Sequence, residues 1–219
     1  MSIKTQLAQI YSSLPSAVSL VAVSKTKPVE MVLEAYRAGQ RRFGENKIQE
    51  MQFKFEALPK DIEWHFIGHV QRNKVRFLAP FVSLIHGVDS LKLLAEIDAE
   101  AAKNNRKIDC LFQIFIASED SKFGLNPTEL QDILVSDIFK ELQNVRIVGL
   151  MGMASFTENV GQIKAEFEGL KSVFDELKNH KTDNFELQIL SMGMSGDYQI
   201  AVDCGSTMVR IGSAIFGGR

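Results

Sequence analysis

The sequence predicts an α/β fold, a single (β/α)8 TIM barrel with one extra helix at the N-terminus. Short apolar runs alternate with amphipathic stretches along the chain, an order typical of a parallel sheet with helices between its strands. Eight apolar runs can be assigned, which is the number that closes such a sheet into a barrel. Barrels of this kind often run to ~200–250 residues as one unit, so residues 1–219 are expected to form one domain. The main alternative, an open doubly wound sheet, would carry a Gly-x-Gly-x-x-Gly turn after an early strand, and the sequence has none.

The chain is expected to open with a helix over Ile3–Ser12, ahead of the first strand. Each predicted strand is a short apolar run, as expected where both faces of a parallel sheet are covered. In chain order, the strands are Ser19–Ser24, Arg42–Gly44, Trp64–Gly68, Leu84–Gly87, Cys110–Ala117, Arg146–Met151, Glu186–Ser191 and Met208–Ile211. The stretches between them repeat their apolar residues at the period of a helix. In chain order, the helices are Val29–Ala38, Lys47–Ala57, Arg72–Leu78, Leu91–Asn104, Pro127–Leu142, Gln162–Lys178 and Asp197–Val202.

Charge and composition exclude several classes of partner. The net charge is −2 at pH 7 and the sequence pI is about 6.1, so there is no basic field for a nucleic acid or an anionic membrane. No apolar run is long enough for a spanning helix, and the N-terminus lacks the apolar core of a secretory signal. Cys110 and Cys204 lack Cys-x-x-Cys spacing and are expected to be reduced thiols, which indicates a cytoplasmic protein.

The histidines show no spacing typical of metal ligands, so no metal site is predicted. His86, near the end of the fourth predicted strand, is expected to be a hydrogen-bonded loop residue rather than a ligand.

A lysine follows the first strand in the stretch VSLVAVSKTKP (Val18–Pro28). Strand alternation puts Val21, Val23 and Lys25 on one face, and chemistry in such barrels collects at the C-terminal strand ends. An amine held neutral by an apolar lumen can attack a carbonyl and form a Schiff base. The alternative is that Lys25 only begins the loop and points into water. Lys27 is expected to be solvated.

Two later loops are candidates for binding phosphate. LSMGMSGD (Leu190–Asp197) follows the seventh strand and opens a helix, with Ser195 as the expected N-cap. VRIGSAIFGG (Val209–Gly218) runs from the eighth strand into small residues. Barrels commonly hold phosphate in these two positions, although each loop could be an ordinary turn. Asp197 would also favour the helix end and could compete with an anion.

Arg210 lies inside an otherwise apolar strand, where its guanidinium must find an acceptor because it can only donate hydrogen bonds. An aromatic ring nitrogen is one candidate acceptor. A carboxylate or backbone carbonyls are the alternatives, and the residues alone leave the choice open.

Together these stretches resemble the pyridoxal-phosphate homeostasis protein family (the YggS/PROSC family) over nearly the whole chain. The motifs that carry the resemblance are AVSKTKP (22–28), RFGENKIQE (42–50), WHFIGHVQRNK (64–74), SKFG (121–124), GLMGM (149–153), LSMGMSGD (190–197) and GSTMVRIGSAIFG (205–217). The resemblance implies a fold like the N-terminal barrel of alanine racemase, with pyridoxal 5′-phosphate (PLP) as the cofactor. By this resemblance Lys25 is the Schiff-base lysine, and Arg210 lies near the pyridine nitrogen. The resemblance also implies phosphate contacts from Ser195, Gly212 and Ser213, pocket-lining roles for Asn46, His65 and Met194, and a role in ligand exchange for Lys122.

The expected function is to carry or buffer PLP in intracellular vitamin B6 homeostasis, without strong catalysis. An arginine at the pyridine nitrogen would leave that nitrogen unprotonated and weaken the ring as an electron sink. Racemases of the alanine type add a tyrosine base from a second domain, and no second domain is expected here. Tyr11, Tyr36 and Tyr198 do not fall at clear strand ends. The protein is therefore expected to be a monomer whose partners are PLP and PLP-requiring apo-enzymes.

Two rival functions remain. One is a PLP-dependent enzyme resembling an amino-acid racemase. The other is an aldolase-like barrel whose lysine attacks a sugar phosphate directly.

Overall fold

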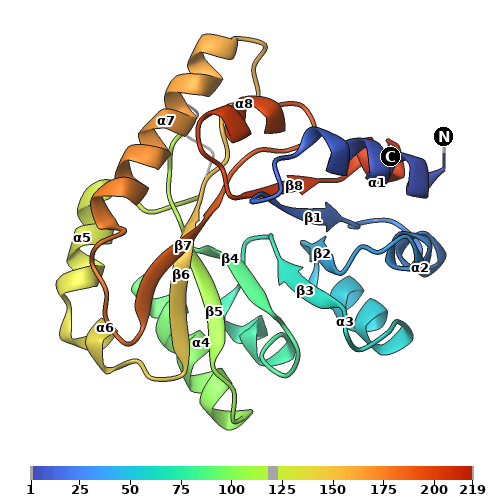
Figure 1. Cartoon of the computed structure of the whole chain (residues 1–219). Helices are drawn as coiled ribbons and strands as arrows, with labels where there is room; N and C mark the ends of the chain where they lie inside the picture. The colour runs from blue at the N-terminus through green and yellow to red at the C-terminus, as the bar shows by residue number, and fades with distance from the viewer. Residues whose placement is uncertain (1, 118–122, 219) are drawn as a thin grey trace.

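The computed structural model describes residues 2–117 and 123–218, whose strands form a closed parallel barrel (Figure 1). Each strand pairs with the next, and β8 pairs back with β1, so the predicted (β/α)8 closure is confirmed. The strands are β1 Ser19–Val23, β2 Arg42–Glu45, β3 Glu63–Phe66, β4 Leu84–Val88, β5 Ile108–Gln113, β6 Val145–Met151, β7 Phe185–Ser191 and β8 Met208–Ile211.

The helices lie outside the barrel and cover the outer face of its sheet (Figure 1). They are α1 Ile3–Ser13, α2 Val29–Arg37, α3 Ile48–Ala57, the 3-10 helix η1 Arg72–Phe77, α4 Leu91–Lys103, α5 Pro127–Val135, α6 Asp137–Glu141, α7 Val160–Leu177, α8 Tyr198–Asp203 and α9 Ser213–Phe216. The expected extra helix is α1, which contacts α2 and α9 and buries Ile3, Leu7 and Ile10.

The helix expected over Pro127–Leu142 is in fact two helices, α5 and α6, which meet at Ser136. This residue has an extended backbone, and its hydroxyl accepts a hydrogen bond from the Phe139 amide as the N-cap of α6. The serine side chain competes with the backbone for hydrogen bonds, which favours a helix start over a helix interior. The short helix α9 was not predicted, and the helix expected over Arg72–Leu78 is of the 3-10 type.

The fifth strand also differs from its prediction, since it begins at Ile108 rather than Cys110 and ends at Gln113 rather than Ala117. The added start includes the polar residue Asp109, whose carboxylate pairs with Arg146 of β6 at 2.9 Å. Beyond the strand, among the described residues, Ile114 forms an isolated bridge with Leu125, and its amide donates to the Met151 carbonyl of β6 at 2.8 Å.

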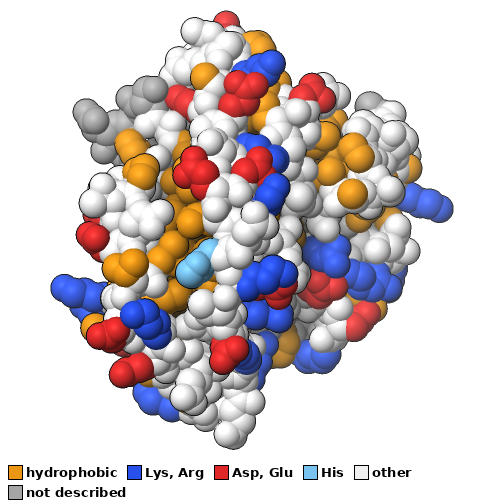
Figure 2. Space-filling view, turned by 60° about the vertical axis from the view of Figure 1, so that its left-hand side comes forward, with side chains coloured by type: hydrophobic (Ala, Val, Ile, Leu, Met, Phe, Trp, Pro, Cys, Tyr) orange, Lys and Arg blue, Asp and Glu red, His pale blue; other side chains and the backbone are white. Residues whose placement is uncertain are grey.

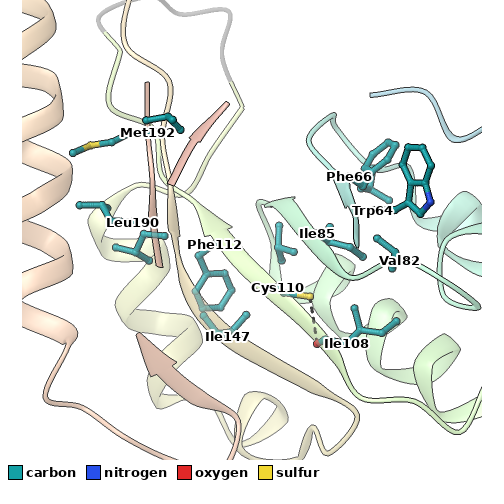
Figure 3. Close-up of a cluster of buried hydrophobic side chains, with 14 of the residues drawn as sticks. Trp64, Phe66, Val82, Ile85, Ile108, Cys110, Phe112, Ile147, Leu190 and Met192 are labelled. Carbon is teal, nitrogen blue, oxygen red and sulfur yellow. Dashed lines mark hydrogen bonds between the residues drawn. The ribbon is translucent and has the colours of Figure 1, made fainter. Parts of the chain in front are cut away.

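The main hydrophobic core fills the layer between the barrel and its helices, and Figure 3 shows part of it. Phe112 of β5 lies beside Ile147 of the neighbouring strand β6 in this view, and Leu190 comes from β7, one strand further on. Phe112 is fully buried, so its ring contributes strongly to stability.

A second, smaller cluster fills the barrel interior. It consists of Val21, Leu84, Leu111, Val148, Met151 and Met208. Polar side chains share this interior, and they include His65, His86, Ser191 and Arg210, all buried. Buried polar groups need hydrogen-bond partners, and these four residues supply partners to one another.

Figure 2 brings forward the face around α5, α6 and α7, where hydrophobic side chains gather in a hollow beside a histidine. A cavity of about 560 Å³ lies here, lined by residues that include Leu134, Leu142 and His180. Acidic and basic side chains are interspersed over the same face. Among the described residues, no helix combines the length and the apolar character that crossing a membrane requires.

Candidate functional site

Three of the predicted site residues follow neighbouring strands at their C-terminal ends. Lys25 lies two residues after β1, Asn46 directly after β2, and Gly212 directly after β8. Since β1 pairs with β2 on one side and β8 on the other, the barrel brings these residues to one edge. Barrel enzymes and cofactor proteins place their chemistry at this edge.

The two lysines of the first loop have different environments. Lys25 is half-buried, and no hydrogen bond or ion pair engages its amine within residues 2–117 and 123–218. Lys27 was expected to be solvated; it is partly exposed, and its amine also donates to the carbonyls of Gly217 (3.0 Å) and Gly218 (2.8 Å) in exposed hydrogen bonds. Lys27 therefore ties the end of the chain to this loop, while the amine of Lys25 stays available.

A buried ionic cluster, which sequence reasoning missed, holds the main chain around Lys25. The Lys54 amine of α3 donates to Glu45 Oε1 at 2.8 Å, to Glu50 Oε1 at 2.7 Å and to the Ser24 carbonyl at 2.7 Å. Glu50 Oε1 also accepts from the Thr26 amide at 2.6 Å. Thr26 has a φ of 65°, which is strained for a residue with a β-branched side chain. The residues on both sides of Lys25 are thus fixed by Lys54 and Glu50.

Glu45 is the deepest member of this cluster and is fully buried. Burial raises the pKa of Glu45, and the neighbouring Lys54 ammonium opposes that rise. Its Oε1 accepts from Lys54 and from the Ser24 hydroxyl, the latter at 2.6 Å, whereas Oε2 has no partner among the described residues. A signal was present in the sequence, because Glu45 directly follows the predicted strand Arg42–Gly44, and Glu50 and Lys54 lie in the predicted helix Lys47–Ala57.

The loop after β7 makes a close turn that depends on glycine. Gly193 has a φ of +96°, and a Cβ there would lie 2.6 Å from the Ala201 side chain. Ser195 is not the N-cap of the next helix, as was expected, because α8 begins at Tyr198 after Asp197. Its hydroxyl instead accepts from the Gly212 amide at 3.2 Å and so joins the two candidate phosphate loops.

Asp197, which could have competed with an anion, is engaged inside its own loop. Its Oδ1 accepts from the Met194 amide at 2.5 Å. The loop after β8 leads into α9, whose first residue is Ser213. The amides that open a helix have no partners within it, so this turn offers donors beside the Ser195 hydroxyl.

Arg210 is buried, and its acceptors are a hydroxyl and backbone carbonyls rather than a carboxylate. Nη1 donates to the Ser191 hydroxyl (2.6 Å) and carbonyl (2.9 Å), and Nη2 donates to the Gly152 carbonyl (3.0 Å). Among the described residues, Nε has no acceptor. Burial lowers the pKa of Arg210 to about 10.

His65 does not lie at the strand ends with Lys25. Its ring is inside the barrel, where Nδ1 lies 3.0 Å from Nε2 of His86. His86 Nδ1 lies 3.2 Å from the Ser191 hydroxyl, so hydrogen bonds link His65 to Arg210 through two residues. His86 is therefore hydrogen-bonded as expected, but it lies within β4 rather than in a loop.

The remaining predicted residues are at the rim or outside the described chain. Met194 is exposed to 37% and Ser213 is also exposed, both on the candidate phosphate loops. Lys122 lies outside the described residues. In the described part of the chain, no group of three or more His, Cys, Asp or Glu residues could hold a metal ion.

Comparison with known proteins relates this site to one family. The family model of the alanine racemase N-terminal domain matches residues 1–219. A pyridoxal phosphate homeostasis protein from Aquifex aeolicus is 41% identical over 201 residues, which cover 91% of this chain and 86% of the relative. The chain belongs to the pyridoxal phosphate homeostasis protein family. The human member is 43% identical over 213 residues, covering 91% of this chain and 76% of the human protein.

Solved structures agree with the family assignment. PipY from Synechococcus elongatus, solved without PLP, has a TM-score of 0.92 at 36% identity and covers 99% of this chain and 100% of its own. PipY with PLP bound has a TM-score of 0.89 at the same identity. Alanine racemase from Bartonella henselae, at 18% identity and a TM-score of 0.73, shares the fold, and this chain covers 58% of it.

Proposed function

We propose that this protein binds PLP covalently but reversibly through the amine of Lys25 and carries or buffers it in vitamin B6 homeostasis. The observation that supports this most is the position of that amine. It is half-buried, without a partner among the described residues, and beside two donor-rich loops at the barrel edge. An amine in this position can condense with an aldehyde whose phosphate occupies the loops.

The phosphate end of PLP fits the loops after β7 and β8. The Ser195 and Ser213 hydroxyls and the opening amides of α9 supply hydrogen-bond donors for an anion. Gly212 brings this turn against β1, because a Cβ there would lie 3.1 Å from the Val23 carbonyl oxygen. The phosphate would thus be held close to the strand that carries Lys25.

The pyridine ring of PLP fits a position beside Arg210, where the ring nitrogen can accept a hydrogen bond. Arg210 keeps an Nε–H donor without an acceptor among the described residues, and the unprotonated pyridine nitrogen is an acceptor. When bound, PLP supplies an aldehyde and an electron-accepting ring. Arg210 would hold the ring nitrogen unprotonated, which weakens the electron sink. Asn46 and Met194 are further cofactor contacts in this proposal, whereas His65, which was expected to be a third, faces the pocket at the other end of the barrel.

A carrier fits these residues better than an enzyme. The hydroxyl groups of the tyrosines are bonded on the helical layer: Tyr11 to Gln40, Tyr36 to Asp61 and Tyr198 to Ser13. None of these contacts places a tyrosine opposite Lys25 as a base. A racemase-like PLP enzyme is the alternative, because alanine racemase has the same fold, but a shared fold does not by itself carry a function. We further propose that residues 1–219 act as one cytoplasmic, monomeric domain whose recipients are PLP-requiring apo-enzymes.

An absorption spectrum of the purified protein with added PLP tests the proposal, before and after borohydride. A band near ~420 nm, lost on reduction and absent from Lys25→Ala, is expected. Lys47→Ala, which removes an exposed lysine near Asn46, is the matched control and should keep the band. A protein that stays colourless with PLP would contradict cofactor binding and favour the aldolase-like reading. Steady-state turnover of an amino acid with inversion of chirality would contradict the carrier role.

A further inference from the structure

A second pocket lies at the end of the barrel opposite Lys25. It has a volume of about 370 Å³ and is lined by residues at the N-terminal ends of the strands, including Ser19, Arg42, Glu63 and Asp109. His65 reaches it from inside the barrel. This volume is within the range of small-molecule sites.

The hydrogen-bond chain behind this pocket determines where the protons of its histidines lie. Arg210 can only donate, so the Ser191 hydroxyl accepts from it at 2.6 Å. The Ser191 hydrogen has one acceptor among the described residues, Nδ1 of His86 at 3.2 Å. His86 therefore carries its proton on Nε2 and donates it to Nδ1 of His65 at 3.0 Å. This leaves the proton of His65 on Nε2.

His65 thus presents an N–H donor at the pocket. The residue is 3% exposed, and among the described residues its Nε2 has no partner. Burial, and secondly the charge of Arg42, lower the pKa of His65 to about 3, so the ring is neutral. Because His65 lines the pocket, this N–H can donate to a ligand that brings an oxygen acceptor.

Arg42 adds a positive charge beside this donor. Its Nε donates to Glu63 Oε2 at 2.8 Å, and its two terminal nitrogens have no acceptor among the described residues. The other carboxylate of the pocket, Asp109, is paired with Arg146 through two bonds of 2.9 Å. Among the described residues, the unused groups therefore include the donors of Arg42 and His65 as well as one acceptor, Glu63 Oε1, and the two acids would oppose a ligand with more than one negative charge.

We infer that this pocket is a second ligand site, which takes a small monocarboxylate between His65 Nε2–H and the Arg42 guanidinium. The apolar part of the ligand would lie against Leu84, Ile189 and Met208, which also line the pocket. The site is independent of Lys25, because the two lie at opposite ends of the barrel.

Calorimetric titration with propionate, and with propionamide as its neutral counterpart, tests this site. Saturable binding of one propionate per chain is expected, with propionamide weaker by about tenfold or more. Arg42→Gln should weaken propionate by about tenfold, whereas Arg41→Gln, in the neighbouring residue that pairs with Asp61, should leave it unchanged. The comparison of the two probes on the wild-type protein does not depend on any variant folding.

The same titration on protein that has been loaded with PLP and reduced with borohydride distinguishes binding at the two ends of the barrel. Propionate should bind it as well as it binds the untreated protein. Loss of binding after loading would mean that propionate occupies the Lys25 end, and it would overturn the inference. Equal affinity for propionate and propionamide, or no saturable binding in the millimolar range, would also overturn it, whatever the outcome for PLP.

Discussion

Replacing Lys54 by methionine should lower the free energy of unfolding by about 3–5 kcal/mol at pH 7. The Lys54 side chain is 2% exposed and Glu45 is fully buried, so the substitution leaves a carboxylate without its cation in the interior. Glu50, exposed to 22%, loses the same partner but can be solvated in part. Breaking a buried pair in this way is far more costly than losing a surface ion pair.

The size of this loss should depend on pH in a defined direction. Burial raises the pKa of Glu45, and removing Lys54 should raise it further. Above the pKa of a glutamate in the unfolded chain, ~4.3, the folded variant then holds a proton that the unfolded chain has released. Stability therefore falls as pH rises through this window. The loss relative to wild type is expected to be larger at pH 7 than at pH 5.

Urea unfolding at pH 5 and pH 7 measures both effects. Lys47→Met, at an exposed lysine of the same segment, is the control and should change stability by ~0.5 kcal/mol or less. A loss for Lys54→Met below ~1 kcal/mol at pH 7, or an equal loss at both pH values, would refute the reasoning. The variant is also expected to bind PLP more weakly. Without Lys54, the Glu50 carboxylate that accepts from the Thr26 amide is no longer held in place, so the main chain beside Lys25 is less ordered.

Other substitutions test the loop, the core and the interior histidines. Gly193→Ala should weaken PLP binding and lower the unfolding midpoint, because its Cβ would clash with Ala201, whereas Gly196→Ala meets no atom within 4 Å and should do neither. Equal effects in both variants would contradict this account. Phe112→Ala should cost about 3–5 kcal/mol in urea unfolding, and a loss under ~1 kcal/mol would mean that its site collapses. Since the pKa of His65 is lowered to about 3, the unfolded chain binds the extra proton below pH ~6.5, so stability should fall on acidification by up to ~1.4 kcal/mol per pH unit. His65→Gln should make that fall shallower between pH 6.5 and pH 5, and an unchanged slope would refute the assignment.

The order of strands was predictable because each strand is a local apolar run. The first and last residues of each strand were harder to predict, and β5 shows why. Asp109 is polar and would usually mark a loop, but near the N-terminal end of β5 it pairs with Arg146 from the next strand. Ser136 divides α5 from α6 for a different reason, since its side chain caps a new helix inside a continuous apolar period.

The sequence by itself determined the barrel and the place of Lys25, Ser195 and Gly212 at its edge, because periodicity and strand order are local properties. Only the tertiary structure decided which partners the buried polar groups take. Lys54 with Glu45, and His65 with Arg210 through two other residues, meet because barrel closure and register bring distant strands together. Hydrogen bonds depend on distances of a few tenths of an ångström, and no local pattern specifies those across a barrel.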